Sequence, residues 1–287
     1  MKSFIRRMKF LLRILPILVW AVLLAPRPAC GEDIEADSRA YMKEELGVNE
    51  YTAPSIAWLL KNLDLFRPIP MEVVDRSHWD DVFSNRLQTS LHFGTLIADG
   101  FIIVTNEHRS DIQDVGRALL RQSKALGVGS SLTRRSNKLL QLGDKGDWAD
   151  LRMELIGTQK DVEESMMELR DEQIAHMISL GGWLRGFYAG TVAASEHYTA
   201  KKSDVLKNTD IIDYFIDRMD TLHPKLKNTQ FVTEISSRLK TIRKIASEAK
   251  DRPLSLSEVQ EMRRLSQEIN RIMVSKVDAE GNVHEKK

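Results

Sequence analysis

The sequence predicts an all-α protein, an antiparallel bundle of about seven to nine helices in which two central helices cross. Apolar residues recur at helical spacing along most of the chain, and no long stretch alternates with the period of two typical of a half-buried strand. Only eight of the 287 residues are proline. Because proline interrupts helices, this composition favours long helical segments.

The first central helix is predicted from the segment LGGWLRGFYAGTVAAS, residues 180–195. Small residues recur there every four positions, and residues four apart form one ridge on a helix. A glycine inside a helix costs about 1 kcal/mol relative to alanine, so this run is expected where close packing offsets the cost. The ridge consists of Gly182, Gly186, Gly190 and Ala194.

A second ridge with the same spacing lies upstream, at Ser90, Gly94 and Ala98. We expect the two helices to cross at these ridges, where missing side chains let the backbones approach. A break at Gly181 and Gly182, giving a hairpin, is one alternative. Another is a pair of membrane helices, in which small residues also recur every four positions. The apolar part of the upstream helix covers only about 15 residues, fewer than the roughly 20 that a bilayer needs.

Asp99 and Arg185 carry opposite charges within the two most apolar segments of the chain. If the two helices cross, these side chains can form a buried ion pair, because a buried charge needs a partner. The alternative is that each side chain points to solvent from its own helix.

The other helices are predicted from apolar spacing and from start signals. Ser77 with Asp80, and Ser255 with Glu258, resemble capping boxes. The apolar pattern that starts at Trp148 has nearly a heptad repeat, typical of a coiled coil, and runs into the glycine ridge. Two prolines predict an extended segment at 67–70. The expected helices span residues 54–64, 79–105, 109–126, 131–142, 148–195, 203–222, 229–249 and 256–275.

The first residues resemble an export signal. A basic start is followed by an apolar run over 14–25, which is too short to span a bilayer as a helix. Small residues at Ala29 and Gly31 allow cleavage near Cys30 or Gly31. An uncleaved anchor in the inner membrane is the alternative, and acylation of Cys30 is disfavoured by Arg27 three residues before it.

Four parts of the chain are expected from these patterns. They are a signal peptide over 1–31, a mobile acidic leader over 32–50, a single helical domain over 51–275 and a disordered polar tail over 276–287. We expect a periplasmic or secreted protein whose mature chain has no transmembrane helix.

Charge and cysteine content limit the possible functions. Removal of residues 1–31 would take away six basic residues and no acidic one, leaving 36 basic and 41 acidic residues, a net charge of −5. This balance gives no electrostatic argument for nucleic-acid binding. Cys30 is the only cysteine, so the mature chain is expected to have no disulfide and no thiolate metal site.

Motifs that carry chemistry are absent from the sequence. There is no Gly-x-Ser-x-Gly elbow, no Walker A loop, no dinucleotide fingerprint and no zincin motif. Glu172 and His176, one helical turn apart, are weak candidates for metal ligands, but an ordinary structural histidine is the more common case. No catalytic residue, metal or cofactor is therefore predicted.

Four stretches between Gly94 and Phe187, namely ADGF, LGVGSSLTR, GDWADLR and HMISLGGWLRGF, resemble a family of exported all-helical bacterial proteins with no activity attached. The resemblance implies export and an all-helical fold. We therefore expect a non-enzymatic interaction or structural protein of the cell envelope, with a protein partner or self-association. The alternative is a periplasmic bundle that binds a small ligand or metal near Asp99, His176 and Arg185.

Overall fold

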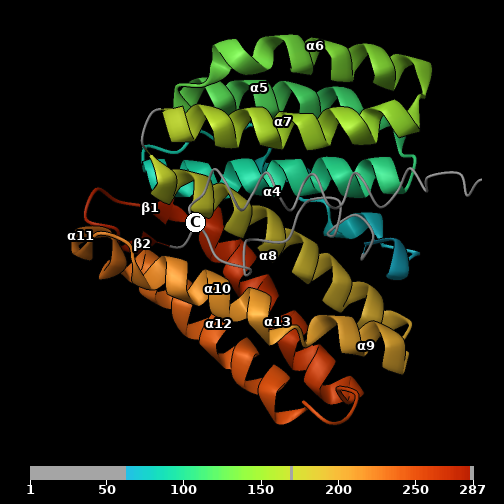
Figure 1. Cartoon of the computed structure of the whole chain (residues 1–287), viewed down its shortest axis with the longest axis vertical. Helices are drawn as coiled ribbons and strands as arrows, with labels where there is room; N and C mark the ends of the chain where they lie inside the picture. The colour runs from blue at the N-terminus through green and yellow to red at the C-terminus, as the bar shows by residue number, and fades with distance from the viewer. Residues whose placement is uncertain (1–62, 169–170, 285–287) are drawn as a thin grey trace, which may run out of the picture. The chain divides into compact units, whose positions relative to one another are not determined.

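Residues 63–168 and 171–284 are described by the computed structural model, and they confirm the all-α prediction (Figure 1). In these ranges nine helices of seven or more residues pack against one another. They are α4 (Arg86–Thr105), α5 (Ile112–Leu126), α6 (Gly129–Lys145), α7 (Trp148–Glu168), α8 (Glu172–Glu196), α9 (Ala200–Leu206), α10 (Thr209–Asp220), α12 (Gln230–Glu248) and α13 (Leu256–Met273).

Short elements precede, connect or follow these helices. They are the 3-10 turns η1 (Met71–Val73), η2 (Arg76–His78) and η3 (Arg109–Asp111), the single turn α11 (Pro224–Lys227), and the strands β1 (Lys276–Val277) and β2 (Val283–His284). The predicted signal peptide, the leader and most of the first predicted helix lie outside the described residues.

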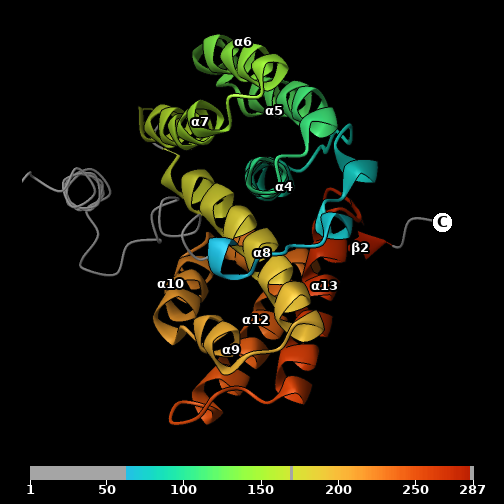
Figure 2. The same cartoon turned by 90° about the vertical axis from the view of Figure 1, so that its right-hand side faces the viewer.

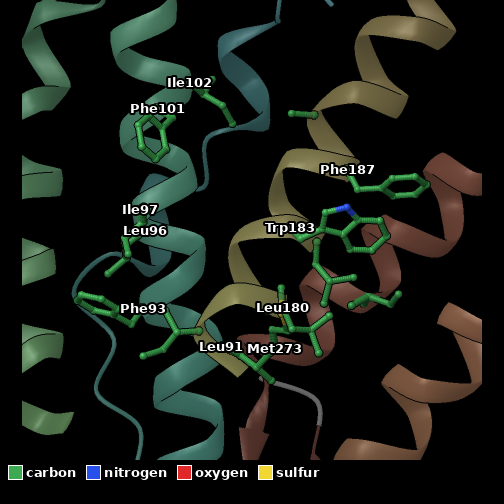
Figure 3. Close-up of a cluster of buried hydrophobic side chains, with 14 of the residues drawn as sticks. Leu91, Phe93, Leu96, Ile97, Phe101, Ile102, Leu180, Trp183, Phe187 and Met273 are labelled. Carbon is green, nitrogen blue, oxygen red and sulfur yellow. The ribbon is translucent and has the colours of Figure 1, made fainter. Parts of the chain in front are cut away.

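Helices α4 and α8 occupy the middle of the described structure. Helices α5, α6 and α7 lie on one side of α4, and α9, α10, α12 and α13 lie on the other side of α8 (Figures 1 and 2). The core between them is aliphatic and aromatic (Figure 3). In that core Phe101 of α4 is fully buried, and the ring of Trp183 stacks on Phe187 with 5.0 Å between centroids.

The two central helices touch backbone to backbone. A Cβ atom added to Gly94 would lie 1.9 Å from the carbonyl oxygen of Ile178, and one added to Gly181 would lie 2.0 Å from that of Leu91. No side chain fits at either position, because backbone atoms cannot move aside as a flexible side chain can. The small residues therefore fix how closely α4 and α8 approach.

The predicted ridge only partly matches this contact. Gly182 faces the backbone of Gly94, whereas Gly190 faces the ring of Phe66 and a methyl group of Leu206. Gly181, outside the predicted ridge, makes one of the closest approaches. The other predicted seam residues are buried in α4 or α8, namely Ser90, Ala98, Gly186 and Ala194. Helix α8 is continuous through Gly181 and Gly182, so these glycines do not break it.

Two predicted helix boundaries were wrong. Helix α4 begins at Arg86, not near residue 79, because the side chain of Asn85 accepts hydrogen bonds from the amides of Leu87 and Gln88. The pattern from Trp148 is divided between α7, which ends at Glu168, and α8. The described structure consequently gives no support to the predicted coiled coil, and α7 packs against α6, α4 and α8.

The predicted helix over 203–222 is also two helices, α9 and α10, because Asn208 caps a new start through a hydrogen bond from Ile211. In contrast, the capping box of Ser255 and Glu258 at the start of α13 is confirmed. Both outcomes follow from short polar side chains that bond to free helical amides.

The C-terminal segment differs from the predicted disordered tail. Its described part contains an antiparallel pair of strands in which Lys276 lies opposite His284 and Val277 opposite Val283. Gly281 adopts a positive φ of 83° in the turn, and Asp278 Oδ1 accepts a hydrogen bond from the amide of Asn282. The side chain of Val277 packs into the core. This apolar contact and the hydrogen-bonded turn give an ordered structure to a segment whose composition is polar.

Candidate functional site

The buried charges form one site at the crossing of α4 and α8. Arg185 Nε lies 3.0 Å from Asp99 Oδ1, at ion-pair distance although without the alignment of a hydrogen bond. The residues are 4% and 0% exposed. The structure thus brings together the two charges that the sequence singled out.

A segment that precedes α4 covers this pair. We call residues 66–85, which contain η1 and η2, the strap. Trp79 of the strap donates a hydrogen bond from Nε1 to Asp99 Oδ2 at 3.0 Å. Arg185 Nη1 donates to the carbonyl oxygen of Val73 at 3.1 Å. Each buried charge therefore forms an ion pair with its partner and a hydrogen bond with the strap, which closes the site to water.

Other polar groups hold the strap in place. Asn106 donates from Nδ2 to the carbonyl oxygen of Ile69 at 2.9 Å, and Gln122 donates to that of Asp81. Arg76 donates from Nε to Asp111 at 2.9 Å, and this contact raises the pKa of the guanidinium. The strap has little regular structure of its own, so these bonds from α4, α5 and η3 determine its path.

Burial shifts the pKa values of two groups at this site. Burial raises the pKa of Asp99 to about 6, while Arg185 and the hydrogen bond from Trp79 oppose the rise. Burial also lowers the pKa of His92 to about 4, and the positive charge of Arg185 acts in the same direction. His92 is therefore neutral near pH 7, whereas most of Asp99 is ionised.

His92 lies in α4 beneath the strap. Its ring meets that of Phe83 edge to face, with 5.1 Å between centroids. Neither ring nitrogen has a hydrogen-bond partner among the described residues. His92, Trp79 and the strap could not be assigned to this site from the sequence, because nothing in their local pattern shows that a distant helix lies against them.

The proposed metal candidates lie elsewhere. Glu172 is exposed in the first turn of α8. His176 is nine positions before Arg185, roughly 13 Å along the helix, and its Nδ1 lies 3.1 Å from the hydroxyl of Tyr214 on α10. Burial lowers the pKa of His176 to about 4, with a further contribution from Arg218. Within the described ranges, no group of three or more His, Cys, Asp or Glu side chains could hold a metal ion.

The chemistry available at the crossing is that of a closed polar network. Both charged side chains have partners inside the protein, and the helices touch through backbone atoms at Gly94 and Gly181. His176 contacts α10 and does not join Asp99 and Arg185. The arrangement therefore ties together two helices and the strap.

One described helix, α4, is long and apolar enough to cross a membrane by length and composition, and its most apolar stretch is entirely buried within the structure. The core of a water-soluble helical protein and a membrane helix both satisfy such a criterion. Here the apolar surface of α4 is covered by α5, α7, α8 and the strap.

Comparisons with known proteins identify no relative. No protein-family model, curated protein or solved structure matches the chain.

Proposed function

We propose that the chain is an exported, non-enzymatic helical protein of the bacterial cell envelope, with a structural or protein-binding role. The observation that supports this most is the closed network of Asp99, Arg185 and Trp79. These buried charges are the best placed for chemistry, but their contacts hold the core and the strap together. The basic residues near the start and the short apolar run over 14–25, which resemble an export signal, support the compartment.

Cell fractionation tests the proposed compartment. The full chain, with a C-terminal epitope tag, would be expressed in a Gram-negative host and its spheroplasts treated with protease. We expect the protein in the periplasmic fraction, or on the outer face of the inner membrane if the N-terminus stays attached. A tagged protein that stays in the cytoplasm and resists protease would refute export.

A comparison of stability with function tests the non-enzymatic role. In a host that carries the gene, deletion is expected to increase sensitivity to detergent or osmotic shock. Asp99→Asn and Arg185→Gln should restore resistance in proportion to the amount of folded protein that remains. A variant that folds to wild-type levels but fails to restore resistance would instead give these groups a chemical role.

The described surface offers little apolar area for a partner. Large exposed apolar side chains are dispersed over separate segments, namely Leu65, Val82, Met153, Tyr198 and Leu256. Such scattered residues are normal on a protein surface. This distribution favours a structural role over docking through a broad apolar face.

Sedimentation velocity of the purified chain over a hundredfold concentration range tests for self-association. Met153, 58% exposed on α7, is the natural position to change. If α7 mediates association, Met153→Glu should lower the sedimentation coefficient, whereas Leu256→Glu, the matched control on α13, should not.

The alternative function is the binding of a small ligand or a metal near the central crossing. Native mass spectrometry and elemental analysis of the purified protein test it directly. One equivalent of metal, or a ligand that is lost in Asp99→Asn, would replace the structural proposal.

A further inference from the structure

A pocket of about 570 Å³ lies away from the central crossing, where α12, the end of α13, η2 and strand β2 meet. This volume is within the range of small-molecule sites in proteins. The strands were not predicted from the sequence, so the pocket became apparent only in the structure. Its walls carry both charged and apolar side chains.

The acceptor groups of the pocket are already bonded within the protein. Glu268 accepts hydrogen bonds from Arg238 on one oxygen and from Arg264 on the other. Glu234 accepts from Gln230 on one oxygen and contacts Arg238 with the other. The amide oxygen of Gln230 accepts from the backbone of Val283. The carboxylates are thus neutralised and are not available to attract a cation.

The donor groups of the pocket are only partly used. Arg271 is exposed at the end of α13, and no described residue forms a hydrogen bond or ion pair with its side chain. The contacts of Arg238 use Nε and Nη1, which leaves Nη2 open. His284 contacts Asp278 through Nε2, so in the neutral ring with the proton on Nε2 its Nδ1 is an acceptor. The donors that remain are therefore those of the two arginines, the guanidinium of Arg271 and Nη2 of Arg238.

The rest of the wall is apolar. Ile272 near the end of α13, Val274 just after this helix and Val283 of β2 line the pocket. Ile272 and Val274 are mostly buried, and Val283 packs partly against the core. A ligand that filled this space would need a polar end near the arginines and a short apolar body.

We infer that this pocket binds a small organic anion, whose carboxylate or phosphate group bonds to Arg271 and Arg238 and whose apolar part contacts Ile272, Val274 and Val283. Guanidinium groups suit both kinds of anion because their planar donors match two oxygens at once. The guanidinium of Arg271, which is unpaired among the described residues, supplies the positive charge. Glu234 and Glu268 already bond to other side chains, so they do not attract a cation to the pocket.

Calorimetric titration of the full chain with three probes of similar apolar length tests this inference. The probes are hexanoate, hexyl phosphate and hexylammonium, each at the same ionic strength because salt screens exposed charges. We expect saturable binding of at least one anion with a dissociation constant in the millimolar range or below, on the order of 4 kcal/mol of binding free energy. Preference for hexanoate or for hexyl phosphate would identify the group, and either result supports the site.

Two arginine variants locate the binding. Arg271→Gln should weaken anion binding by about tenfold or more, because it removes a charge-assisted contact, and Arg271→Lys should recover part of the loss. Arg134→Gln on α6 is the matched control: Arg134 is also exposed, and no described residue pairs with its side chain. Its binding should equal that of the wild type. Since Arg271 has no described partner, its variants should keep the wild-type Tm.

Three results would overturn the inference. The first is the lack of saturable binding of either anion up to about 10 mM. The second is anion binding that Arg271→Gln and Arg134→Gln leave equally strong. The third is binding of hexylammonium as tight as that of the anions, which would show that the apolar wall alone holds the probe.

Discussion

Two helix contacts in this protein use glycine in different ways. Between α4 and α8, the neighbours of Gly94 and Gly181 are backbone carbonyl groups. Between α6 and α7, the neighbour of Gly157 is the guanidinium of Arg135, and a Cβ atom there would lie 2.1 Å from Nη1. The glycines of the first contact face rigid backbone atoms, whereas Gly157 faces the end of a flexible side chain.

The ion pairs near the two contacts also differ in how deeply they are buried. The Arg135 guanidinium pairs with Asp161 and bonds to Glu154 at 3.1 Å, in a partly exposed position. Asp99 and Arg185 near the first contact are almost completely buried. A glycine against backbone determines the distance between two helices, whereas a glycine beneath a side chain allows a polar network that can rearrange.

The largest effect is expected from Gly94→Ala. The new Cβ would clash with the carbonyl of Ile178, and α4 and α8 would have to separate, at a cost of about 3 kcal/mol or more. Chemical denaturation measures the change in the free energy of unfolding. Gly100→Ala in the same helix is the control, since its neighbour is the side chain of Leu155 at 3.2 Å. Equal losses of unfolding free energy in the two variants would show that the backbone neighbour of Gly94 does not make its substitution more costly.

Asp99→Asn should cost about 3 kcal/mol, because Arg185 would keep its charge in a buried site without a counter-charge. The asparagine oxygen can still accept from Trp79, so the loss isolates the ion pair from that hydrogen bond. Thermal and urea unfolding both report the change. A variant as stable as the wild type would show that the pair contributes nothing to the central contact.

His92→Leu should alter how stability depends on pH. The pKa of His92 is lower in the folded chain than the ordinary value of 6.5. Its contribution is therefore fully present above pH 6.5 and is lost as the pH falls towards 4. Relative to the wild type, the leucine variant should gain up to about 3 kcal/mol on acidification from pH 7 to 4, at about 1.4 kcal/mol per pKa unit.

Asp99 has the opposite effect in nearly the same range. Its pKa is raised to about 6, so its contribution is present below about pH 4 and is lost as the pH rises through 6. In the wild type the two slopes partly cancel, and urea unfolding across pH 4–7 should be flatter than in His92→Leu. Identical pH profiles for the two proteins would show that His92 does not titrate below its ordinary range.

The smallest effect is expected from Gly157→Ala, about 1–2 kcal/mol. The guanidinium of Arg135 must move, but its long side chain can do so, and alanine improves helix propensity by about 1 kcal/mol. Arg135→Ala removes the ion pairs with Asp161 and Glu154 and has a cost of its own. In that background, however, Gly157→Ala should cost little, because the obstructing group is gone. If the double variant is less stable than the sum of the single variants predicts, Gly157 contacts more than Arg135.

Parts of the candidate site could be predicted from the sequence. Asp99 and Arg185 stood out because a charge in an apolar helix requires a partner, and only one opposite charge lay in a comparable setting. The strap could not be assigned, since Trp79 and Val73 meet the pair only after residues far apart in sequence are brought together. The alternative ligand site grouped His176 with Asp99 and Arg185 because it shares a helix with Arg185, but in the structure His176 contacts Tyr214 of α10.

Local sequence patterns predict the helical class, the two central helices and the capping box at Ser255, because these depend on the spacing of residues within a few turns. The packing of distant segments determines which glycines touch a backbone, where the strap lies and how the C-terminal strands complete the anion pocket. Those features depend on which distant surfaces meet, and local periodicity carries no information about that choice. Gly181 illustrates the point, because only its contact with Leu91 of another helix distinguishes it from any other glycine in α8.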